Sequence, residues 1–252
     1  MRVRLPLGRG LFFLCAFLFS AVALLPLRLT ADWLRLGDTG VAAREAVGSV
    51  WGGALHGAQY RDAQLGDLLA GLDALPLLAG RARIELERNR DLLARTAPIR
   101  TGGAPDQLKA ALTVSRNSYA LSDATARLAL GPEWAPLPIT AIDLSDVSAR
   151  FVGGECASAE GAVTVETPGS ILGLPIPASM TGNARCDGGA LLLPLAGASG
   201  AERLDLRLPG GDRYRATLSL RATDPTLQQR LAAAGFLAAG GVYSLSIEGR
   251  LQ

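Results

Sequence analysis

The chain has only one histidine, His56, among its 252 residues. A Ser-His-Asp or Cys-His catalytic arrangement would therefore have to use His56. No G-x-S-x-G segment is present to supply a serine nucleophile. A lone histidine beside a turn glycine is usually a surface or packing residue, and His56 precedes Gly57. We therefore expect no catalytic residues and no enzymatic activity.

Motifs for metals and nucleotides are missing from the sequence as well. There is no H-E-x-x-H segment, no closely spaced cysteine pair and no histidine cluster that would indicate a zinc site. Neither G-x-G-x-x-G nor G-x-x-x-x-G-K-[ST] occurs. We expect no metal and no cofactor. The acidic residues are scattered along alternating segments, and only the fold could assemble two of them into a glycosidase-like pair.

Positive charge is not concentrated anywhere in the chain. Lysine and arginine together number 25 against 23 acidic residues, and Lys109 is the only lysine. The densest basic segment is Arg-Ala-Arg at residues 81–83, which we interpret as a solvated face. Because a nucleic-acid-binding domain usually carries a concentrated basic patch, we expect no nucleic-acid partner.

The N-terminus combines positive charge with a long apolar run. Arg2, Arg4 and Arg9 precede residues 10–27, which contain no charged side chain. A helix of about 18 residues just crosses a bilayer core. The arginines predict that the N-terminus stays in the cytoplasm. We expect residues 1–9 to be a cytoplasmic tail, residues 10–27 an uncleaved transmembrane helix and residues 28–252 a periplasmic domain.

The N-terminal apolar segment has two other interpretations. A signal peptide could be cleaved after Ala23, because Ala21-Val22-Ala23 fits the small-x-small pattern. The apolar run continues through Leu24, Leu25 and Leu27 without a break, which favours an anchor that is kept. A buried helix of a soluble domain is the third interpretation, but such domains rarely open with a charged and then apolar segment.

The chain has three cysteines, and only two of them lie beyond the apolar run. Cys15 falls inside the run, where we expect it to face lipid or another helix. Cys156 and Cys186 form an even pair, which is consistent with one disulfide. Such a bond closes a loop of about 30 residues and contributes roughly 3.5 kcal/mol in the chain-entropy model. It persists only in an oxidising compartment.

Most of the remaining sequence alternates between polar and apolar residues, with turns rich in glycine and proline. This period of two predicts half-buried β-strands. The clearest predicted strands are residues 81–87, 107–116, 119–130, 142–151, 162–167, 203–208, 213–222 and 242–251. The fold class is therefore mostly β, an antiparallel meander or curved sheet that follows the N-terminal helix.

Two short helices and several connections interrupt the strands. Pro76 is predicted to start a helical turn over residues 75–80, and Asp224, Pro225 and Gly235 mark the ends of a second helix. Residues 44–58 predict a hairpin whose turn uses the glycine pair Gly52-Gly53. Residues 101–105 form the predicted boundary between two subdomains. The apolar connector at residues 171–177 is expected to be a covered loop or part of a groove.

The order of these features resembles protein N of the bacterial type II secretion system. The resemblance rests on the single N-terminal apolar span and on residues 48–58 followed by residues 75–80. It also rests on the paired-cysteine region, with Cys156 before Gly161 and Val163 and with Cys186 after Gly182. The similarity covers most of the chain.

The resemblance implies a single-pass inner-membrane protein whose bulk lies in the periplasm. Such a protein is a non-enzymatic accessory component of the apparatus that exports folded proteins across the outer membrane. Its partners are expected to be other inner-membrane components of that apparatus. The alternative from the residues is a membrane-anchored periplasmic β module that binds lipid or another hydrophobe in an apolar groove.

Overall fold

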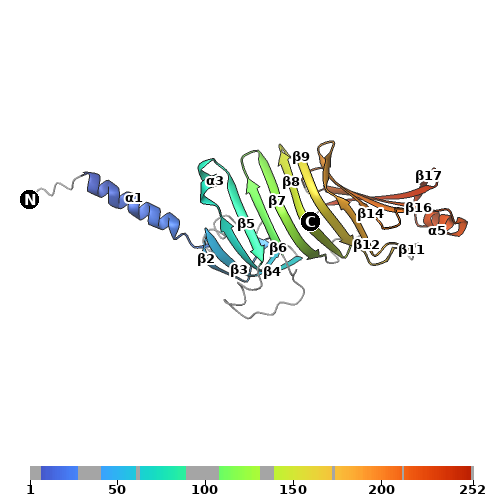
Figure 1. The fold of residues 1–252 in the computed structure, drawn as a ribbon, viewed down its shortest axis with the longest axis horizontal. Helices are drawn as coiled ribbons and strands as arrows, with labels where there is room; N and C mark the ends of the chain where they lie inside the picture. The colour runs from blue at the N-terminus through green and yellow to red at the C-terminus, as the bar shows by residue number, and fades with distance from the viewer. Residues whose placement is uncertain are drawn as a thin grey trace, which may run out of the picture.

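A long curved β-sheet makes up most of the molecule, and an apolar helix projects from one end of it (Figure 1). The computed structural model describes residues 7–27, 41–60, 63–88, 108–130, 139–171, 174–211 and 213–250. The projecting helix is α1 (Leu7–Ala23), which has 17 residues. Within these described ranges, none of the helices has the length and apolar character needed to cross a membrane.

Sixteen strands form one antiparallel sheet, and two more form a separate small sheet. In chain order the strands are β1 (Val41–Ala42), β2 (Glu45–Ser49), β3 (Gly52–Tyr60), β4 (Ala63–Leu72), β5 (Ala82–Arg88), β6 (Leu108–Val114), β7 (Ser118–Ala129), β8 (Ala141–Val152), β9 (Glu155–Glu166), β10 (Ser170–Ile171), β11 (Leu174–Pro175), β12 (Ser179–Asn183), β13 (Arg185–Asp187), β14 (Ala190–Ala196), β15 (Glu202–Leu208), β16 (Arg213–Arg221), β17 (Leu237–Ala239) and β18 (Val242–Arg250). The predicted fold class, mostly antiparallel β with few short helices, is confirmed.

Strands that are consecutive in the chain are mostly neighbours in the sheet, as in a meander. Strands β3 to β9 follow one another without a crossover, and so do β14 to β16. The departures are local: β1 and β2 both pair with β3, and β17 pairs with the outer edge of β18. Because almost every pairing is between sequence neighbours, the sheet is built from short-range connections.

The predicted boundary at residues 101–105 lies outside the described residues. The strands before and after it, β5 and β6, pair antiparallel from Ala82↔Val114 to Arg88↔Leu108. A small cluster of buried side chains also draws on both sides of it, since Leu68 packs with Leu108. The sheet therefore runs continuously past this point in the sequence.

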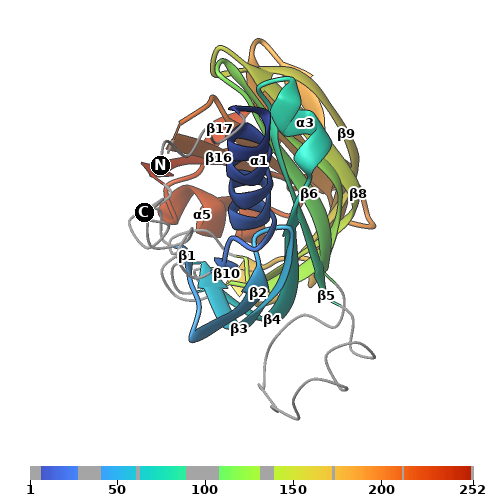
Figure 2. The same ribbon diagram turned by 90° about the vertical axis from the view of Figure 1, so that its left-hand side faces the viewer.

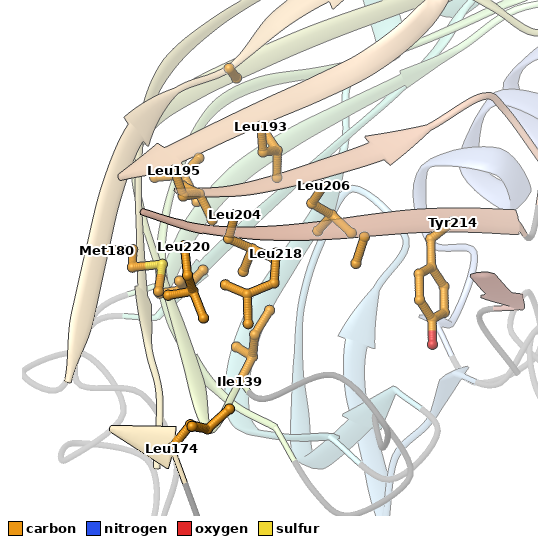
Figure 3. Close-up of a cluster of buried hydrophobic side chains, with 14 of the residues drawn as sticks. Ile139, Leu174, Met180, Leu193, Leu195, Leu204, Leu206, Tyr214, Leu218 and Leu220 are labelled. Carbon is orange, nitrogen blue, oxygen red and sulfur yellow. The ribbon is translucent and has the colours of Figure 1, made fainter. Parts of the chain in front are cut away.

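The main hydrophobic core lies on one face of the second half of the sheet. Leucines alternate with polar residues along β15 and the second half of β16, whereas β14 is apolar throughout. The register places Leu195 opposite Leu204 and Leu204 opposite Leu218. These side chains gather with Met180 and Leu220 on the same side of the strands (Figure 3). Seen along its length, the sheet curves around the helix α5 (Pro225–Ala233) (Figure 2), and Leu231 of α5 belongs to the same core cluster, so this face is on the inside of the curve. We call it the inner face.

The end of the core is covered by the helix α5 (Pro225–Ala233) and by the connector at residues 171–177. The carboxylate of Asp224 accepts a hydrogen bond from the Thr226 amide at 3.1 Å, and Gly235 follows with a positive φ of 87°. These are the predicted start and end of the helix. Leu231 of α5 is fully buried, and Leu174 and Ile176 of the connector are buried too, as expected for a covered loop.

The predicted hairpin turn at Gly52-Gly53 is wrong in its position. The turn lies at Val50 and Trp51, and both glycines belong to β3. The residue with positive φ is Gly48, at 95°. A Cβ on Gly48 would come within 2.9 Å of the Cα of Gly53 across the ladder. Gly48 and Gly53 are required because the two backbones approach closely, rather than to make the turn, whereas a Cβ on Gly52 would meet nothing within 4 Å.

The predicted helical turn near Pro76 is present but begins earlier. Helix α3 (Ala74–Leu78) starts two residues before Pro76. Proline is tolerated there because the first turn of a helix has no intrahelical partner for its amide groups. The turn ends with Gly80 at a positive φ of 68°.

A disulfide joins Cys156 in β9 to Cys186 in β13, with the two Cα atoms 5.5 Å apart. Strand β12 pairs with β9 as far as Asn183↔Ala162, and the Ala184 amide then donates to the Gly161 carbonyl at 2.9 Å. Strand β13, which follows, pairs with β14. The disulfide therefore holds β13 against β9 just beyond the point where the ladder between β12 and β9 ends.

Replacing Cys186 by serine should lower the free energy of unfolding by about 3.5 kcal/mol, because the loop of 30 residues is no longer closed in the unfolded chain. The measurement is denaturant unfolding of the purified full-length chain without reductant. Cys15→Ser is the matched control, since Cys15 is a free cysteine. An unchanged unfolding midpoint for Cys186→Ser would contradict a structural role for the bond.

Gly182→Ala should destabilise the protein by about 2 kcal/mol or more, through overpacking. A Cβ at Gly182 would lie 1.9 Å from the backbone oxygen of Pro194, so the pairing of β12 with β14 has to open. Gly52→Ala is the control, because a Cβ at that strand position meets nothing within 4 Å. Equal unfolding midpoints for the two variants would show that the close approach of β12 and β14 is wrong.

Candidate functional site

The single histidine is a buried residue of the sheet. His56 lies in β3 with its Nδ1 atom 3.6 Å from Oδ1 of Asp67 in β4, and both side chains are about nine-tenths buried. The same Asp67 oxygen accepts a hydrogen bond of 2.7 Å from the Gly57 amide. Gly57 has a positive φ of 59° and lies in the bulge between Leu55 and Ala58. Asp67 thus holds the backbone of this bulge in place, while the buried Nδ1 atom of His56 makes no hydrogen bond to a described residue.

No group of residues in the described ranges is arranged to hold a metal ion. No set of three or more histidine, cysteine or acidic side chains that could hold a metal ion occurs there. The ion pairs are on the surface, such as Arg127–Glu166 at 2.6 Å and Arg215–Glu248 at 2.7 Å. Exposed pairs of this kind contribute little to stability.

An open hollow of about 260 Å³ lies across the middle of β7, β8 and β9. Small side chains dominate its lining, among them Ala120, Ser148 and Ser158, and its charged members are Arg150 and Glu160. It lies beside the irregular pairing of β7 with β8.

The inner face carries a band of apolar side chains that continues from the main core across the first half of the sheet. Directly paired residues share a face in an antiparallel ladder. One row of the band crosses β4 to β9, and it consists of Leu72, Ile84, Leu112, Leu121, Ala149 and Ala159. The opposite face of the same strands is more polar, with Arg83, Thr113 and Arg150 in a neighbouring row.

The apolar band is only partly covered where it nears the strand ends. Val114 pairs with Tyr119, and Tyr119 pairs with Phe151. The two aromatic rings stack with their centres 4.7 Å apart. Leu112, Tyr119 and Val114 remain 36–42% exposed. The core in the second half of the sheet is closed, whereas this first half presents apolar surface.

Two segments named in the sequence analysis meet at the end of the sheet next to α1. The amide of Val50, in the β2–β3 turn, donates to the carbonyl of Leu25 at 3.0 Å, and the Leu72 amide donates to the Val50 carbonyl at 3.0 Å. Helix α3 begins two residues after Leu72. The cysteine pair lies further along the sheet, at the turns that follow β8 and β13.

Sequence reasoning found the cysteine pair but missed two features of this surface. It did not single out Leu75 and Leu78 of α3, whose side chains are 80% and 88% exposed. The uncharged run Leu75-Pro76-Leu77-Leu78 was the available signal. It also missed the Tyr119–Phe151 stack, because nothing local marks which strand residues lie opposite one another.

Comparison with known families finds one match that covers most of the sheet. The family is described as Type II secretion system (T2SS), protein N, and it matches residues 39–246. Comparison with curated proteins finds no match, and comparison with solved structures finds none either. The matched segment begins after α1, includes β1 to β17 and ends within β18. The match extends over far more than half of the chain. The chain therefore belongs to the type II secretion system protein N family.

Proposed function

We propose that the chain is a non-enzymatic accessory component of the type II secretion system at the inner membrane. It supports the export of folded proteins across the outer membrane through contacts with other inner-membrane components of the apparatus. The observation that carries this proposal is the family match over residues 39–246.

The proposal includes a single membrane anchor formed by α1 and the residues after it. The side chains of Leu11, Phe12, Phe13, Leu14 and Phe17 are 53–70% exposed. At 1.5 Å per residue α1 measures about 26 Å, somewhat less than a hydrocarbon core of about 30 Å. Leu24, Leu25 and Leu27 extend the apolar stretch, and a bilayer thins locally around a short span.

The sheet is proposed to lie in the periplasm, with the N-terminus in the cytoplasm. Arginines on the N-terminal side of α1 support this orientation. The pairing of Cys156 with Cys186 supports it independently, since structural disulfides persist in oxidising compartments. A tail at residues 1–9 and a periplasmic part at residues 28–252 follow from this topology.

The alternative function is a periplasmic module, anchored in the same way, that binds a lipid or another hydrophobe. The apolar band on the inner face favours it, because Leu112, Val114 and Tyr119 are partly exposed there. Exposed apolar surface on a soluble face usually marks a binding site. In this alternative the occupant is an acyl chain rather than a partner protein.

The mature protein should keep its N-terminus, because the apolar run continues past Ala23 without a break. Intact mass spectrometry of the protein purified from membranes is the measurement. The expected mass includes residues 1–23, with or without the initiator methionine. A mature chain that begins at Leu24 would contradict the anchor and leave a periplasmic protein without a span.

Affinity purification of the tagged full-length chain from native membranes in mild detergent should recover other inner-membrane components of the secretion apparatus. Proteins and lipids in the eluate are both identified by mass spectrometry. An unrelated single-span inner-membrane protein with the same tag sets the background for each. Lipid at that background together with secretion components is the expected result, while stoichiometric lipid without any secretion component would favour the alternative function.

A further inference from the structure

Helix α3 carries two leucine side chains that are almost fully exposed in the described part of the chain. Its sequence is Ala-Leu-Pro-Leu-Leu, and none of its residues is buried. Leu75 and Leu78 are 80% and 88% exposed. Scattered exposed leucines are ordinary on a protein surface. Two almost fully exposed leucines on one uncharged helical turn form an apolar surface of the kind that usually contacts a partner or a membrane.

The exposure of these leucines does not come from a loosely held segment. Before the helix, the Asp73 amide donates to the Arg83 carbonyl at 2.9 Å, and the two side chains form an ion pair of 3.3 Å. After it, the amides of Gly80 and Arg81 donate to the carbonyls of Leu77 and Pro76. Backbone hydrogen bonds and the flanking ion pair hold the turn in place. The side chains of Leu75 and Leu78 are therefore not needed to hold it.

The position of α3 indicates what its exposed leucines contact. Two hydrogen bonds connect the end of α1 to the start of α3, from Val50 to Leu25 and from Leu72 to Val50. Figure 1 shows α3 at the end of the sheet from which α1 projects, with β17 at the far end. The proposed anchor places the exposed apolar side chains of α1 in lipid. A lipid surface that surrounds α1 therefore ends close to α3.

A basic side chain next to α3 matches the same environment. Arg81 is exposed and directly follows Gly80, where the turn ends. Among the described residues the structure records no acidic partner for it, whereas Arg83 is paired with both Asp73 and Glu85. Apolar side chains beside a cationic one are typical of segments that lie in the membrane interface.

We propose that α3 lies in the interface of the bilayer that holds α1, with Leu75 and Leu78 at the boundary between head groups and acyl chains. Arg81 then meets lipid phosphate groups. This inference rests on the proposed anchor. The molecule gains a second attachment beside α1, and this attachment sets the direction in which the sheet extends from the membrane.

Lipid contact can be measured with a fluorescent thiol label on the full-length chain. The chain is reconstituted in vesicles of phosphatidylethanolamine and phosphatidylglycerol that contain lipids with a nitroxide on the acyl chain. Three proteins are compared: native Cys15, Cys15→Ala with Leu78→Cys, and Cys15→Ala with Leu237→Cys. Leu237 in β17 is the matched control, because it is also a bare leucine, 75% exposed, at the far end of the sheet.

The label at position 78 should lose about half of its fluorescence to the nitroxide lipid, since interfacial segments reach about 5–10 Å into the head-group boundary. The label at position 237 should lose none. Adding Leu75→Ser and Arg81→Gln to the Leu78→Cys protein should reduce the quenching, because the other two contacts with lipid are removed.

The label on Cys15 separates failure of this inference from failure of the anchor. Quenching at Cys15 without quenching at position 78 would overturn the contact of α3 and leave the anchor intact. If even Cys15 is not quenched, both are overturned. A label at position 78 that is shielded from aqueous iodide and also from the nitroxide lipid would show that a protein covers α3, which overturns the proposal as well.

Discussion

The hydrogen-bonded ladder between consecutive antiparallel strands is the interaction on which the rest of this structure depends. It pairs the backbone of each strand with its neighbours and separates the side chains into two faces. A sheet of 16 strands with one apolar face has to cover that face. The second half does so by curving and by placing Leu231 of α5 over the core, whereas the first half leaves part of its apolar band open. The two halves thus share one ladder but differ in how much of their apolar face is exposed.

Several residues that do not follow the alternating sequence pattern lie where the ladder is interrupted or crowded. Gly182 allows β12 to approach β14, and Asp67 holds the bulge at Gly57. The bond between Cys156 and Cys186 continues the attachment of β9 to the next strand where backbone pairing ends. Each is a local substitute for a missing or crowded ladder contact. These residues stabilise the sheet, and the surfaces left for function lie elsewhere, on α1, α3 and the open part of the inner face.

A component that acts by contacts needs defined surfaces more than it needs reactive groups. The family match supplies the context of protein secretion, and the structure supplies three chemically different surfaces. The polar outer face carries arginine and acidic side chains, the open inner face carries Leu112 and Tyr119, and the end beside α1 carries Leu75 and Leu78. Because the two faces belong to one continuous sheet, the proposed lipid contact at the end beside α1 would set the direction in which both faces point.

The sequence by itself determined most of the strands, the helix at Asp224 and the pairing of the cysteines, because alternation with period two, helix caps and an even number of thiols are local or countable signals. It did not find β4 or β14, whose residues do not alternate between polar and apolar. Only the tertiary structure decided that Gly48 and Gly53 serve a close approach, that His56 lies buried beside Asp67 and that Tyr119 stacks on Phe151. It also decided that α3 leaves Leu75 and Leu78 exposed while Leu231 of α5 is buried in the core. The physical reason is that register, curvature and exposure depend on which distant residues come to lie side by side, and a periodic pattern carries no information about them.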